Sequence, residues 1–161
     1  MTKHAKRRSP MDHALGYLAA RDRTVWEMQA YLDKQEFGEA DVDATIDRLK
    51  ELGLLDDRRY AKRFVRTRLA SKPVSRAHLY RQLLEHRIER VWIDEALSEI
   101  HIDAELENAS AVAAKFWRQF RALEPELRRQ RVLSHLQARG FGYEISQKAL
   151  ASAQSESEEE A

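Results

Sequence analysis

The stretch LYRQLLEHRIERVWIDEAL, residues 79–97, occurs in three versions along this chain of 161 residues. The other two versions are MQAYLDKQEFGEADVDATI, residues 28–46, and VLSHLQARGFGYEISQKA, residues 132–149. Each has a leucine anchor (Leu32, Leu83, Leu136), and the anchors are 51 and 53 residues apart. The apolar residues matched around the anchors are Met28, Leu79 and Val132; Phe37, Ile88 and Phe141; Val42, Ile93 and Ile145; and Ile46, Leu97 and Ala149. Five matched apolar positions in three copies predict a tandem structural repeat.

Each copy is predicted to contain three short helices. The first helix precedes the quoted stretch and carries the widest apolar face, with the i, i+3, i+4 spacing of a buried helix. Its apolar residues are Ala14, Leu15, Leu18 and Ala19; Tyr60, Ala61, Phe64, Val65 and Leu69; and Val112, Ala113, Phe116, Trp117 and Phe120. The second helix holds the anchor, and the third holds the last two matched positions. Because the chain has only 5 glycines and 3 prolines, we predict an all-α fold with short loops.

Residues that start and stop helices support these boundaries. Thr24 and Glu27 have the spacing of a capping box, and Pro125 is expected at the first position of a helix. Gly53 and Gly140 follow helical stretches, where a left-handed residue is expected. The joints between second and third helices are expected near 35–40, 86–91 and 139–144. The predicted units are a basic disordered tail at 1–10, three-helix repeats at 11–54, 55–101 and 102–153, and an acidic disordered tail at 154–161.

Composition excludes several classes of protein. The chain has no cysteine, which excludes a disulfide scaffold, a thiol nucleophile and a cysteine-based zinc site. No apolar run approaches the ~18 residues of a membrane span, and no signal-peptide core follows the basic N-terminus, so we expect a cytoplasmic protein. The six histidines lack metal-ligand spacing, and the glycines form no phosphate-binding loop. We therefore expect no enzymatic activity, no metal site and no cofactor.

The net charge of +1 conceals an asymmetry along the chain. Residues 11–55 carry a net charge of −5, whereas residues 56–100 carry +4. This asymmetry indicates a polyanionic partner and possibly a second, protein partner. A well-solvated helical surface explains it equally well.

The densest positive charge falls on the first helix of the second repeat. This first basic cluster consists of Arg58, Arg59, Lys62, Arg63 and Arg66. The last four of these cations share one face of the helix. No acidic residue interrupts that face, so it can follow phosphates and bind nucleic acid without base preference. The alternative is a solvated face on a helix that Asp56 and Asp57 cap.

A second basic cluster lies in the third repeat. Its members are Arg128, Arg129, Arg131, Arg139 and Lys148. Arginines in the first turn of a helix oppose the helix dipole, so an anion or an acidic partner surface would favour them. Local pairing with Glu124 and Glu126 is the equal alternative.

Three segments of the chain carry a family resemblance. They are residues 14–21 (ALGYLAAR) followed by Thr24, Glu27 and Met28; residues 49–61 (LKELGLLDDRRYA); and Arg128-Arg129 through Ala138-Arg139-Gly140-Phe141. Together they resemble the RecX family, the bacterial regulators of the RecA recombinase. The middle segment is the most specific, since it resembles the family's run L-G-[LY]-[LI]-[DN]-D-x-x-[FY]-[AV]. The resemblance covers roughly residues 11–153, but the glycines that the family often has near Lys72-Pro73 and Arg87-Ile88 are absent.

The resemblance implies three three-helix repeats in an elongated, curved molecule that binds along the groove of the RecA–single-stranded DNA filament. Capping or disassembling the filament there would inhibit ATP hydrolysis, strand exchange and coprotease activity. The expected partners are the RecA filament and single-stranded DNA, contacted directly or through RecA, and the protein is expected to be a monomer that binds no membrane. Carried over by position, the two basic clusters are the expected contact surfaces.

Short three-helix units also resemble helix-turn-helix modules, so a free-standing nucleic-acid-binding module is the alternative function. That module predicts duplex affinity with base preference, although none of the predicted third helices is basic. The filament regulator predicts weak affinity for DNA alone and strong affinity for the filament. A purely structural adaptor, the third possibility, predicts no salt-sensitive affinity for DNA.

Overall fold

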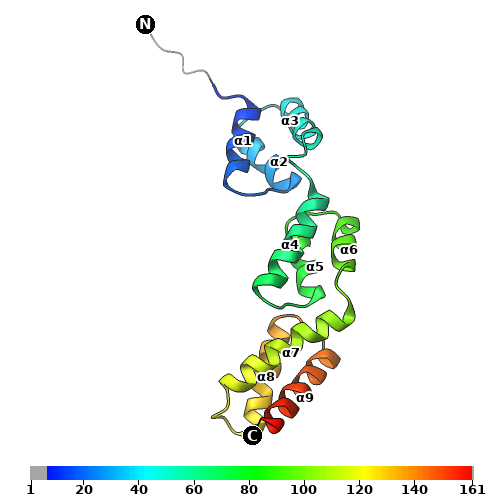
Figure 1. Cartoon of the computed structure of the whole chain (residues 1–161). Coiled ribbons are helices and arrows are strands. Elements are labelled where there is room, and N and C mark those ends of the chain that lie inside the picture. Colours follow the sequence, from blue (N-terminus) through cyan, green and yellow to red (C-terminus); the bar gives the residue numbers. More distant parts are fainter. Residues whose placement is uncertain (1–6, 161) are drawn as a thin grey trace.

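The computed structural model describes residues 7–160, which form nine helices and no strand. The helices are α1 (Pro10–Ala20), α2 (Val25–Lys34), α3 (Glu39–Glu51), α4 (Asp57–Ser71), α5 (Arg76–Glu85), α6 (Arg90–Ser98), α7 (Ile102–Gln119), α8 (Pro125–Ala138) and α9 (Tyr143–Glu159). They group into three bundles of three that follow one another in an elongated row (Figure 1). This arrangement confirms the predicted all-α fold of three tandem three-helix repeats.

Each repeat has a hydrophobic core of its own. The anchors Leu32, Leu83 and Leu136 are fully buried, one in each core. The first helix of each repeat faces its anchor with a fully buried alanine, namely Ala14, Ala61 and Ala113. No pair of helices from different repeats packs extensively within residues 7–160. The repeats are therefore separately packed units joined in series.

One part of the predicted apolar face is wrong in α1. Leu15 remains 45% exposed and Ala19 is also exposed, whereas Met11 and Tyr17 pack against the core beside Ala14. The buried face of α1 therefore runs through Met11, Ala14, Tyr17 and Leu18, which share one side of the helix at i, i+3 and i+4 spacing, and Leu15 and Ala19 lie off that side.

The predicted caps and joints are confirmed. The Thr24 hydroxyl accepts from the Glu27 backbone N–H, and the Glu27 carboxylate accepts from the Thr24 N–H. The joint between second and third helix contains a left-handed residue four positions after each anchor: Glu36 (φ 61°), Arg87 (φ 59°) and Gly140 (φ 81°). Arg87 thus adopts the turn without the glycine that the family often has at this place.

The two predicted tails have different outcomes. The basic tail falls mainly on residues 1–6, which lie outside the described residues, and α1 already begins at Pro10. The acidic tail expected at 154–161 is instead helical as far as Glu159. Packing explains the difference, since Ala153 is buried and the Trp117 indole N–H donates to the Ser157 hydroxyl at 3.2 Å. The end of α9 is therefore part of the third repeat.

Candidate functional site

The first basic cluster lies along α4. The N-cap of α4 is Asp56, whose carboxylate accepts a hydrogen bond from the backbone N–H of Arg59 at 3.0 Å. Ala61 and Val65 are buried in the core of the second repeat, so the helix period leaves the cations on the outer faces of α4.

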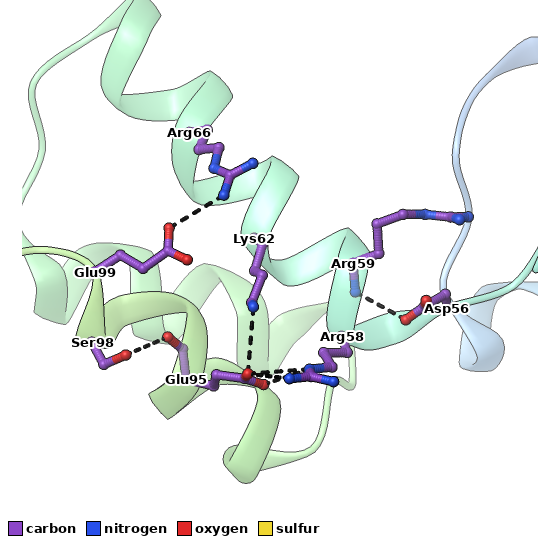
Figure 2. A network of polar contacts seen from close by, with 8 residues as sticks. All are labelled: Asp56, Arg58, Arg59, Lys62, Arg66, Glu95, Ser98 and Glu99. Atoms are coloured by element: carbon purple, nitrogen blue, oxygen red, sulfur yellow. Dashed lines mark hydrogen bonds and ion pairs between the residues drawn. The ribbon is translucent and has the colours of Figure 1, made fainter.

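Glu95 of α6 and Glu99, the C-cap of α6, pair with three cations of this cluster (Figure 2). The Arg58 guanidinium donates to both carboxylate oxygens of Glu95, at 2.6 to 3.1 Å. Lys62 Nζ lies 3.4 Å from the same carboxylate. One turn further along, Arg66 lies 3.5 Å from Glu99. The hydrogen bonds from Arg58 hold the pKa of Glu95 below its usual range, so this carboxylate stays charged.

The other two cations of the cluster reach toward the first repeat. Arg63 pairs with Asp22, in the loop between α1 and α2. Arg59 donates to the Gly53 carbonyl at 2.7 Å. All five cations of the first basic cluster therefore have partners inside the chain, although the four arginines stay exposed to solvent and only Lys62 is partly buried.

A partly buried polar contact links the first two repeats. The Asp57 carboxylate, at the start of α4, accepts the backbone N–H of Val25 at 2.9 Å. Asp57 is thus a tie between repeats, and only Asp56 caps α4 as expected. Burial raises the pKa of the Asp57 carboxyl above its ordinary value. On the other side of the same junction, His86 Nδ1 lies 3.4 Å from a Glu27 carboxylate oxygen.

Two members of the second basic cluster hold the third repeat together. The Arg128 guanidinium lies 3.7 Å from the centre of the Trp117 ring and donates to the Trp117 carbonyl at 2.8 Å. Arg129 donates to the Gln154 side-chain carbonyl at 3.3 Å. The alternative of local pairing is not found, because no ion pair joins Glu124 or Glu126 to these arginines within residues 7–160.

The remaining members of the second basic cluster are more dispersed. Arg131 is exposed on α8, and Lys148 pairs with Glu144 at 3.3 Å on α9. Arg139, at the end of α8, lies 5.0 Å from the centre of the Phe116 ring and donates to the His135 carbonyl at 3.3 Å. The structure therefore does not gather the five cations of the second basic cluster on one face.

Sequence reasoning missed the acidic partners Glu95 and Glu99. Their i, i+4 spacing at the end of α6 and its C-cap is visible in the sequence, but their pairing with α4 depends on how α4 and α6 pack. No group of three or more histidine or acidic side chains suited to a metal ion occurs in the described part of the chain. Nor does any helix there have the length and hydrophobicity that crossing a membrane requires.

Comparisons with known proteins agree along most of the chain. Family models of the first, second and third three-helix domains of RecX match residues 11–49, 56–97 and 103–150. Regulatory protein RecX of Chlorobium phaeobacteroides is 33% identical over 130 residues, which cover 81% of this chain and 83% of that protein. Regulatory protein RecX of Bacillus pumilus is 32% identical over 147 residues, covering 91% of this chain but only 56% of its longer relative.

Two solved structures have a similar fold. The crystal structure of RecX from Lactobacillus salivarius superposes with a TM-score of 0.80 at 21% identity, covering 90% of this chain and 94% of that one. A second crystal structure, of a regulatory protein RecX, gives a TM-score of 0.77 at 25% identity over 86% of this chain and 69% of that one. The three-bundle row is thus similar to experimentally determined folds.

Proposed function

The chain belongs to the RecX family of regulatory proteins, and on this premise we propose that it is a negative regulator of RecA. In this proposal it binds along the groove of the RecA–single-stranded DNA filament. There it inhibits the ATPase, strand-exchange and coprotease activities of RecA. The protein acts as a cytoplasmic monomer and by binding alone, without a catalytic step.

The observation that carries the proposal is the match to all three RecX domains in order along one elongated row of bundles. A row of separately packed repeats presents similar surfaces at intervals along its length. Such a molecule suits a partner that is itself periodic, and a protein filament with a continuous groove is one. One bound chain could then contact several neighbouring protomers.

We assign the contact surfaces to the two basic clusters, with different roles for their members. Arg63 and Arg66 keep more than 60% of their side chains exposed although they pair with Asp22 and Glu99. Exposed ion pairs contribute little to stability, so these cations can exchange an intramolecular partner for an acidic or phosphate partner at small cost. Arg128 instead acts within the third repeat by holding Trp117.

The test is RecA ATPase on single-stranded DNA, titrated with this protein below one molecule per RecA. Inhibition at such ratios is expected. The variant R63Q/R66Q should require more protein for the same inhibition. K34Q/R48Q is the matched control, since it removes the same charge from exposed positions in the first repeat.

No inhibition by the wild-type chain in excess over RecA would overturn the proposal. Base-selective binding to duplex DNA would then favour the helix-turn-helix module. Equal loss of inhibition in both double variants would remove the assignment to Arg63 and Arg66, because net charge alone would explain the effect.

A further inference from the structure

A groove lies at each junction between repeats. The first groove lies between repeats 1 and 2. The residues that line it include Arg21, Asp22, Arg63, Phe64 and His86. The second groove, of about 440 Å³, lies between repeats 2 and 3, and its decisive residues are Lys72, Lys115, Phe116 and Arg139. Both grooves are built from the loop after the first helix of one repeat and the first two helices of the next.

The two grooves occupy equivalent places in the repeat. Arg63 and Lys115 follow the buried alanines Ala61 and Ala113 by two residues, and Phe64 and Phe116 follow them by three. His86 and Arg139 each lie three residues after their leucine anchor. Arg21 and Lys72 each lie three residues before the N-cap of the next helix, which is Thr24 in one case and Ser75 in the other. The repeat has therefore placed a cation or a histidine at the same points of both grooves.

Carboxylates neutralise two of the three arginines that line the first groove, and the third, Arg68, lies 5.0 Å from the centre of the Phe64 ring without an ion pair among the described residues. Arg63 pairs with Asp22, which itself lines the groove. Arg21 lies 3.4 Å from a carboxylate oxygen of Glu27. An incoming anion would therefore have to compete with two carboxylates.

The second groove has no such acids. Proline occupies position 73, the place equivalent to Asp22, and no acidic residue is among those that line the groove. Lys72, Lys115 and Arg139 form no ion pair among residues 7–160. Three unneutralised cations around one hollow repel one another, and a bound anion would relieve that repulsion.

Two neighbouring side chains, Arg139 and His135, also indicate a positive electrostatic potential at this groove. Arg139 Nε is buried and has no hydrogen-bond partner among the described residues, so no acceptor within the chain offsets the charge of this guanidinium at that atom. The His135 ring is stacked on Phe116 at 3.8 Å between ring centres. Burial first, and then the positive charges of Arg139, Arg131, Lys115 and Lys72, lower the pKa of His135. Cations from α7, α8 and the α4–α5 loop thus act together at this point.

We propose that the second groove binds the phosphate groups of single-stranded nucleic acid directly, through Lys72, Lys115 and Arg139. This inference goes beyond the proposed function because it needs no RecA. It favours nucleic acid over an acidic protein because Phe116, the aromatic residue of the groove, is only 7% exposed and offers no apolar anchor to a protein partner. Contacts made by cations alone give binding without base preference.

The test is fluorescence anisotropy of a labelled oligothymidylate with the full chain, without RecA, over a range of salt concentrations. Each lysine–phosphate contact in a single-strand complex contributes about 0.7 to the slope of log K against log salt, so K72Q/K115Q should lower the slope by about 1.4. Its loss of affinity between about 50 and about 200 mM salt should then be roughly sevenfold smaller than that of the wild type.

Two further variants make the result specific. K34Q/R48Q removes the same charge from exposed positions in the first repeat, outside both basic clusters, and should leave the slope nearly unchanged. Lys115→Arg keeps the charge of the groove and should retain the wild-type slope. Helical circular dichroism of each variant verifies that its fold is intact.

Three results would overturn the inference: no binding of the wild type at low salt, a slope that K72Q/K115Q leaves unchanged, or an equal fall in K34Q/R48Q. If K72Q/K115Q keeps its affinity for the oligonucleotide but binds RecA filaments more weakly, the groove faces protein and the inference is wrong. RecA ATPase measured in parallel separates this inference from the proposed function. DNA binding without ATPase inhibition supports the groove and contradicts the regulator, and inhibition without DNA binding does the opposite.

Discussion

Replacement of Gly140 by alanine tests whether repeats 2 and 3 touch as the structure shows. Gly140 lies in the turn between α8 and α9 with φ of +81°, and a Cβ there would lie 2.6 Å from Ser75 Oγ and 3.0 Å from His78 Cβ. Ser75 is fully buried, and its hydroxyl caps α5 by accepting the His78 backbone N–H at 3.1 Å. The hydroxyl therefore cannot rotate away from the new methyl group without uncapping α5.

Gly53 provides a matched control, because it has a similar φ of +70° but nothing within 4 Å of its would-be Cβ. Left-handed backbone costs an L-residue about 1–2 kcal/mol, and this cost applies to both glycines. Overpacking or loss of the Ser75 cap adds about 1–3 kcal/mol at Gly140 alone. We therefore expect G53A to lower the free energy of unfolding by about 1–2 kcal/mol and G140A by about 2–5 kcal/mol.

The assay is thermal and urea unfolding of both variants followed by helical circular dichroism. In a chain of this size, about 1 kcal/mol corresponds to a shift in Tm of roughly 2–4 °C. The methyl group can also be accommodated if the two repeats move apart, and small-angle X-ray scattering would then show a longer molecule. Equal destabilisation of G53A and G140A, with unchanged dimensions, would refute the packing of this turn against the start of α5.

Two further predictions concern single polar residues. D57A should lower stability by about 1 kcal/mol because it leaves the Val25 N–H without its partner, whereas D57N retains an accepting oxygen and should be at least as stable as the wild type at neutral pH. Burial raises the pKa of Asp57 in the folded protein above its value in the unfolded chain, so the charged carboxylate costs stability only at a pH above the unfolded pKa. In urea unfolding, any advantage of D57N should therefore be absent below the unfolded pKa and should grow as the pH rises from the unfolded pKa to the raised folded pKa. R128A should destabilise the third repeat by about 2 kcal/mol, because it loses the stacking on Trp117 and the hydrogen bonds to the Trp117 carbonyl. The control R131A should change stability by less than about 0.5 kcal/mol. Equal urea midpoints for the two variants would contradict the structural role of Arg128.

The repeat architecture could be predicted from the sequence because it depends on buried positions. Leu32, Leu83 and Leu136 recur at nearly constant spacing, and each must face a core whatever the surface does. Helix caps were equally accessible, since Thr24 with Glu27 and the left-handed Gly140 act through residues close to them in sequence.

The charged surface could not be predicted in the same way, because its partners come from distant elements. Arg58 meets Glu95, which lies 37 residues further along, and only the packing of α4 against α6 brings them together. The acidic C-terminal segment was misjudged for a similar reason. Its composition suggests disorder, but the bond from Trp117 to Ser157 spans 40 residues and is invisible to a local pattern.

The three separate cores determine where this molecule can bend. Few contacts join neighbouring repeats in the described part of the chain, among them the bond from Val25 to Asp57, whereas each bundle has a hydrophobic core of its own, so we expect bending at the joints. A change of curvature therefore rearranges a small number of surface bonds and leaves every leucine anchor in place. A chain built in this way can adjust its curvature at the joints, and so remain in contact with a helical partner whose pitch varies.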